Sequence, residues 1–182
     1  MSERSKEIMT GLFRDRDAAE RAYGCVTSRG YDKSDVSLLM SEDTRTRCFP
    51  RTERDTELGT KAAEGAGIGA VAGGGLGALL AGLAAAGIAV PGLPIIALGP
   101  LAAALAGGAT GGAVGGIVGG LIGYGIPEER AKLYDKGIGE GGIVLGVTPR
   151  TPEDADYFDR EWRAAHGEQI YRPAPPTVRS RP

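Results

Sequence analysis

The feature that most constrains this chain is a run of 63 consecutive residues, 65–127, that contains no charged side chain. Small and aliphatic residues fill nearly all of it, and Thr110 and Tyr124 are its only polar side chains. Prolines and glycines interrupt the run at 91–94 and 99–100. Each of the two remaining arms has about 25 residues, more than the roughly 20 that a helix needs to cross a bilayer. The sequence therefore predicts a long α-helical hairpin over 62–126.

Glycines recur every four residues along both arms, which places them on one face of each predicted helix. Such a face lets two helix backbones approach closely, and it favours self-association. So many glycines would weaken a helix in water by about 1 kcal/mol each relative to alanine. In lipid, the cost of an unsatisfied backbone group enforces the helix. A parallel series occupies positions 108, 112, 116 and 120. The predicted packing residues are Gly65, Gly69, Gly73 and Gly77 in the first arm and Gly107, Gly111, Gly115, Gly119 and Gly123 in the second.

Two β-α-β units flank the apolar segment. The first half, 11–40, reads as a strand at 11–13, a helix that starts at a capping box of Asp17 and Glu20, and a strand at 36–40. The second half, 127–172, begins with a linker helix from Glu128. A strand at 143–148, a helix capped by Thr151 and a strand at 169–171 follow. Two such halves predict an α+β fold with a ferredoxin-like four-stranded sheet, two helices on one face and the glycine-zipper hairpin inserted between the halves.

The remaining segments are polar and carry no periodic apolar pattern. We expect a polar N-terminal tail over 1–10, a polar linker over 41–61 and a disordered proline-rich tail over 173–182.

The charged and reactive residues do not form a recognisable site. Basic and acidic residues number 21 and 23 and are spread over both flanks, so no basic surface for nucleic acid is expected. Two cysteines, Cys25 and Cys48, indicate reduced thiols rather than a zinc site or disulfide framework. A dinucleotide-like pattern at 67–72 lacks the preceding strand and the later acidic residue that the motif needs. His166 fits a helix end. We expect no catalytic residue, no metal and no cofactor, and hence no enzyme.

The hairpin suggests where the chain acts. An inserted hairpin would place both flanks on one side of a bilayer, and Lys61, Arg130 and Lys132 favour the cytoplasmic face of the membrane. The expected partners are a lipid bilayer and further copies of the chain. A first alternative is a cytoplasmic protein whose hairpins build a soluble multimer or filament. A second is a regulatory module that binds a small ligand or partner, by analogy with other ferredoxin-like sheets.

Several motifs resemble the bacterial general stress protein 17M-like (YflT-type) domain family. They are Gly11-Leu12-Phe13 with the Asp-Ala-Ala-Glu-Arg-Ala run at 17–22, and Gly-Ile-Pro-Glu-Glu at 125–129 after the glycine-zipper block. Tyr134, Gly137 and the strand at 142–147 complete the resemblance, which touches most of 11–171. The resemblance implies a stress-associated protein without an established enzymatic activity, and it implies no catalytic residue. The arginine-rich segment at 45–54 and the proline-rich tail do not match the family.

Overall fold

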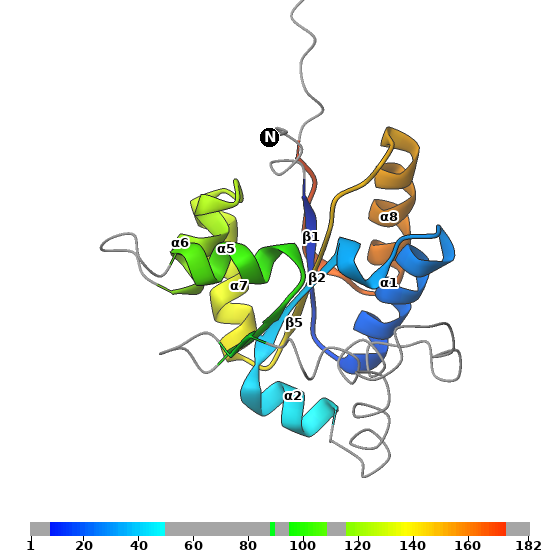
Figure 1. Ribbon diagram of the computed structural model, residues 1–182. Helices are drawn as coiled ribbons and strands as arrows, with labels where there is room; N and C mark the ends of the chain where they lie inside the picture. Colours follow the sequence, from blue (N-terminus) through cyan, green and yellow to red (C-terminus); the bar gives the residue numbers. More distant parts are fainter. Residues whose placement is uncertain (1–7, 50–87, 90–94, 109–115, 174–182) are drawn as a thin grey trace, which may run out of the picture.

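The computed structural model describes residues 8–49, 88–89, 95–108 and 116–173. These residues form a mixed α/β arrangement in which helices lie on both faces of a six-stranded antiparallel sheet (Figure 1). The strands, in the order β3-β4-β2-β5-β1-β6, are β1 (Met9–Phe13), β2 (Val36–Ser41), β3 (Ile88–Ala89), β4 (Ile95–Leu98), β5 (Ile143–Val147) and β6 (Glu168–Tyr171). The helices are α1 (Arg16–Ser28), α2 (Glu42–Cys48), α5 (Pro100–Gly108), α6 (Ile117–Gly123), α7 (Glu128–Gly139) and α8 (Pro152–Ala164), and a 3-10 helix η2 spans Lys33–Asp35.

The elements β1-α1-β2 and β5-α8-β6 lie where the sequence predicts them. The predicted cap of α8 is confirmed, because the Thr151 hydroxyl accepts a hydrogen bond from the backbone N–H of Asp154 at 3.1 Å. The predicted start of α1 at Asp17 is wrong. Asp15 caps that helix by accepting from the backbone N–H of Ala18 at 2.7 Å. The extended backbone at Asp15 lets its carboxylate accept from the first turn of the helix. The cap therefore lies at Asp15, two residues before the predicted position at Asp17.

Both faces of the sheet are buried. Helices α1 and α8 cover one face, while α5, α6 and α7 lie on the other (Figure 1). In β5, Ile143 and Leu145 belong to the core beneath α1 and α8, and Val144 belongs to the core beneath α5–α7. Side chains alternate between the two faces of a strand, so a sheet covered on both sides needs apolar residues at every position. This explains the continuous apolar runs of β2 and β5.

Two predicted polar segments are shorter than expected. The predicted C-terminal boundary of the N-terminal tail, residue 10, is wrong, because Ile8 and Met9 are buried and β1 begins at Met9. The linker over 41–61 is wrong over Glu42–Cys48, which form α2. The Ser41 hydroxyl accepts from the backbone N–H of Thr44 at 3.1 Å, and two acidic residues in the first turn suit the helix dipole. Residues 1–7, 50–61 and 174–182 lie outside the described part.

The predicted helical hairpin is seen only in part: α5 and α6 are helices in its second arm, and other described residues of the segment differ from the prediction. Strand β3 lies at the end of the first arm and β4 lies in the break between the arms, and β4 pairs antiparallel with β2 in the register Leu38↔Leu98. Its second arm is not one continuous helix, because Gly116, with φ 99°, is not helical and α5 and α6 pack against each other. Gly99 turns the chain from β4 into α5 with φ 74°, and a side chain there would collide with the Val36 carbonyl oxygen. Residues 62–87 of the first arm lie outside the described residues.

Candidate functional site

Helix α5 packs against strands β2 and β4 of the sheet, and α6 packs against α5 and α7 (Figure 1). Leu101 and Leu105 of α5 and Ile117 and Leu121 of α6 are buried in the core that this helix pair shares with α7 and the sheet. The described part of the apolar segment therefore contributes to the core of its own domain. Burial of these four side chains explains why the inward faces of both helices are aliphatic.

Gly120 of α6 lies directly against Leu105 of α5. A Cβ added to Gly120 would lie 3.0 Å from Cα and 3.1 Å from Cγ of Leu105, and closer still to Leu105 Cδ2. Leu105 is only 2% exposed, so its side chain has little room to move away. Only a residue without a side chain lets α5 and α6 approach to this distance. This is the close packing that small residues permit between helices.

The side of α5 and α6 that points away from the sheet carries no charged residue. Ile122 is 37% exposed, the highest exposure of a large apolar side chain in these two helices. Nothing lies within 4 Å of the position where Gly123 would carry a Cβ. We call this surface the apolar outer face and define it by Ala103, Gly119, Ile122 and Gly123.

The predicted packing glycines are distributed unevenly over the structure. Gly65, Gly69, Gly73, Gly77, Gly111 and Gly115 lie outside the described residues, and Gly107 lies in α5. Gly119 and Gly123 lie in α6 at the apolar outer face, whereas the glycine that contacts Leu105 is Gly120 of the parallel series. Within this domain, the parallel series thus supplies the tight helix contact. Over the described residues, no helix combines the length and the apolar character that a membrane crossing requires.

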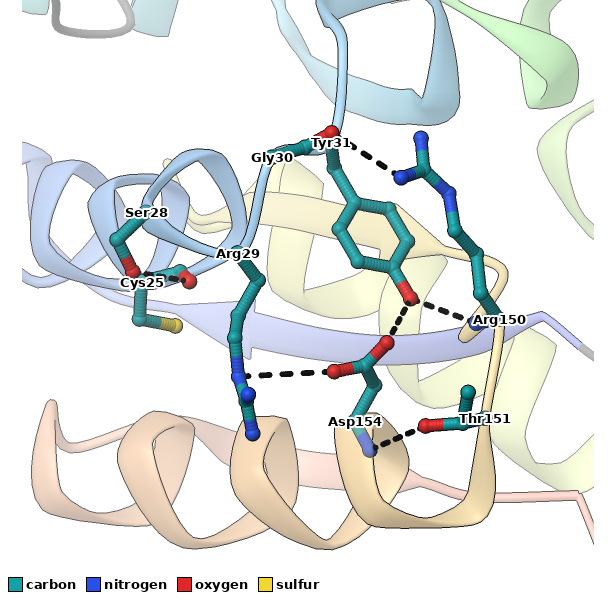
Figure 2. Close-up of polar contacts among 8 residues, drawn as sticks. All are labelled: Cys25, Ser28, Arg29, Gly30, Tyr31, Arg150, Thr151 and Asp154. Atoms are coloured by element: carbon teal, nitrogen blue, oxygen red, sulfur yellow. Dashed lines mark hydrogen bonds and ion pairs between the residues drawn. The ribbon is translucent and has the colours of Figure 1, made fainter.

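A polar cluster joins the loop after α1 to the start of α8 (Figure 2). The Tyr31 hydroxyl donates to Asp154 Oδ2 at 2.7 Å and accepts from the backbone N–H of Arg150 at 2.6 Å. The Arg150 guanidinium lies 4.2 Å from the centre of the Tyr31 ring and donates to Gly30 O at 3.1 Å and to Asp35 Oδ2 at 2.8 Å. Arg29 Nε lies 3.5 Å from Asp154 Oδ1.

The chemistry of this cluster is that of a structural tie. Burial, with the hydrogen bond to Asp154, raises the pKa of Tyr31 to about 12, so its hydroxyl stays protonated at neutral pH. The Tyr31 hydroxyl, both Asp154 carboxylate oxygens and the Arg150 guanidinium all have partners within the cluster. The sequence gives little sign of this arrangement, because Tyr31 and Asp154 are 123 positions apart.

Two further candidate reactive groups are the half-buried Cys25 thiol and the buried Tyr134 hydroxyl. Burial raises the pKa of the Cys25 thiol to about 11, and Cys25 Sγ donates to Ala22 O at 3.0 Å, so this thiol is protonated and unreactive at neutral pH. Tyr134 is fully buried, and burial raises its pKa to about 12. Its hydroxyl donates to Gln169 O at 2.7 Å and lies 2.8 Å from Thr10 Oγ1. Like Tyr31, Tyr134 links segments that are far apart in the sequence, here β1 and β6.

Comparison with known proteins adds no relative: no family model matches the chain, and neither the curated proteins nor the solved structures contain a match.

Proposed function

We propose that this chain is a non-enzymatic, stress-associated protein that acts by association. In this proposal the uncharged segment attaches the domain to the cytoplasmic face of a membrane and brings copies of the chain together. The domain itself is assigned a ferredoxin-like split, with the glycine-rich segment inserted between its halves. The strand order β2-β5-β1-β6 and the position of α1 and α8 on one face support that assignment. The stress-associated role is what the resemblance to general stress protein 17M-like domains implies.

The observation that carries the proposal is the apolar outer face. A helix at the surface of a protein in water normally turns charged residues outward. Helix α7 does so, with the ion pair of Glu128 and Lys132 at 2.6 Å. Helices α5 and α6 instead expose Ile122 beside glycine and alanine. Contact with lipid or with another copy would remove this surface from water, which favours association.

A second candidate function is a multimer that forms without a membrane. The packing of α5 onto the chain's own sheet, and of α6 onto α5 and α7, favours it, because the inward apolar side chains of both helices are already buried within the domain. The apolar outer face would then be the contact between copies. Gly119 and Gly123 would allow close approach between those copies.

Membrane fractionation of the expressed full chain separates the two candidates. Recovery with the membrane pellet after an alkaline carbonate wash, and release only by detergent, supports membrane attachment. Recovery in the supernatant as a species much larger than one chain supports the multimer. Recovery in the supernatant as a monomer contradicts association as the function of the chain.

A further inference from the structure

The sheet alternates strands from two separate parts of the chain. We define the N-terminal part as residues 8–49, which supply β1 and β2, and the C-terminal part as the described residues from 88 to 173, which supply β3–β6. Strand β2 lies between β4 and β5, and β1 lies between β5 and β6. The two strands of the N-terminal part are therefore not neighbours. Each is enclosed on both sides by strands of the C-terminal part.

This interleaving means that neither part can complete its backbone hydrogen bonds alone. Within the described structure, every pairing of β1 and of β2 is made with β4, β5 or β6. Without β1 and β2, the C-terminal part retains only the short pairing of β3 with β4. Isolated strands with open edges are unstable in water and pair readily with other strands. Each part thus presents vacant strand positions that fit the other.

Side chains from the two parts also meet in the core and at the surface. Trp162 is fully buried and its indole Nε1 donates to Ala22 O at 3.2 Å, which ties α8 to α1. The hydroxyl of Tyr31 donates to Asp154 (Figure 2), and the Arg150 guanidinium donates to Asp35. These contacts combine the apolar burial of Trp162 with hydrogen bonds of defined geometry. They define which surface of one part recognises the other.

From the strand order and these contacts, we propose that the N-terminal and C-terminal parts are binding partners in their own right. The two parts hold together through strand interleaving without the covalent connection across 50–87, and the C-terminal part of a second copy fits the N-terminal part equally well. This inference concerns the domain alone and does not depend on the proposed membrane attachment or self-association.

The test is cleavage of the folded full chain at one engineered position. One version of the chain carries the recognition sequence of a site-specific protease between Arg54 and Asp55, and a second version carries it after Lys61. The version that folds like the unmodified chain is used for the cleavage. After complete cleavage, both fragments are expected to co-elute in size-exclusion chromatography and to keep the fluorescence of buried Trp162. Elution of two separate fragments, or loss of the N-terminal fragment by aggregation, overturns the proposal.

Reassembly distinguishes true binding from slow separation. Cleaved protein is unfolded in urea together with cleaved protein whose N-terminal fragment carries an affinity tag, and the mixture is refolded. The proposal predicts that the tagged N-terminal fragment is recovered with an equal amount of the C-terminal fragment. Recovery of the tagged fragment alone contradicts it.

A matched pair of variants measures the specific contacts. Tyr31→Phe leaves Asp154 and the Arg150 N–H without their partner and is expected to weaken the binding of the two fragments by about tenfold or more. Tyr157→Phe also removes a hydroxyl but breaks no hydrogen bond seen in the structure, so it should change this affinity by less than about threefold. Equal affinities for the two variants would refute the role of the Tyr31 contacts.

Discussion

Substitution of Gly120 by alanine adds one methyl group at the contact between α5 and α6 and so tests how closely these helices pack. The added methyl would lie 3.0 Å from Leu105 Cα, and closer still to Leu105 Cδ2. Leu105 is buried, so either its side chain leaves its preferred conformation or the helices separate. Overpacking of this kind costs about 1–3 kcal/mol.

Gly123→Ala is the matched control, because Gly123 lies in the same helix and has nothing within 4 Å of its Cβ position. Replacement of a helical glycine by alanine stabilises by up to about 1 kcal/mol, with the smaller gain expected at a helix end. This helix-propensity gain stabilises both variants, so it does not account for a lower stability of Gly120→Ala. The free energy of unfolding of Gly120→Ala is therefore expected to lie about 1–3 kcal/mol below that of Gly123→Ala.

Urea unfolding followed by the fluorescence of Trp162 measures this difference. Trp162 is the only tryptophan of the chain and is fully buried, so its emission reports the folded domain. The two variants should differ in transition midpoint with a similar dependence on urea concentration. Equal free energies of unfolding, or a more stable Gly120→Ala, would refute the close approach of α5 and α6 at Gly120.

Three further predictions concern other parts of the domain. Tyr134→Phe leaves Gln169 O without its buried donor and should lower the free energy of unfolding in urea by about 1–3 kcal/mol. Because the pKa of Tyr134 is raised by burial from 10.0 to about 12, the unfolded chain loses this proton first. The stability that it contributes should be complete below pH 10 and disappear between pH 10 and about 12, and Tyr134→Phe should flatten this alkaline loss in unfolding measured from pH 8 upward. Thr151→Ala removes the cap of α8 and should cost about 1 kcal/mol in thermal unfolding, whereas Thr151→Ser should cost much less.

Local signals in the flanks were sufficient to predict their elements. The strand at Ile143–Val147 is β-branched and bounded by glycine and proline, and the cap at Thr151 is followed by proline. The signal for α2 was also present, because Ser41 precedes Glu42 and Asp43 as a cap precedes an acidic first turn. The polar composition of α2 concealed it, since this short helix shows no long apolar stripe.

The apolar segment was harder to interpret because apolar length does not distinguish a buried helix from one that faces lipid. Ile95–Leu98 is a short apolar run between Pro94 and Gly99, a pattern that also fits a buried strand. Its pairing with β2 depends on a contact between distant residues, which periodicity cannot reveal. For the same reason, the spacing identified two glycine series but not which of them contacts α5.

The tie between Tyr31 and Asp154 could not be predicted from the sequence. Neither residue belongs to a local motif for such a contact, and only the antiparallel arrangement of β2 and β5 brings their loops together. Asp154 lies in the first turn of α8, where an acidic residue suits the helix dipole. Its second role, as the acceptor for Tyr31 and the ion-pair partner of Arg29, depends on the assembled sheet.

Flotation with liposomes tests most directly whether the apolar outer face mediates association. Ile122→Lys places a charge at the centre of this face, and Gly24→Lys adds the same charge at an open position of α1 on the opposite side of the sheet. We predict that Ile122→Lys lowers the fraction bound to liposomes by about tenfold, equivalent to about 1.4 kcal/mol, and that Gly24→Lys binds as the unmodified chain does. Equal binding of the two variants would contradict the assignment of association to the apolar outer face.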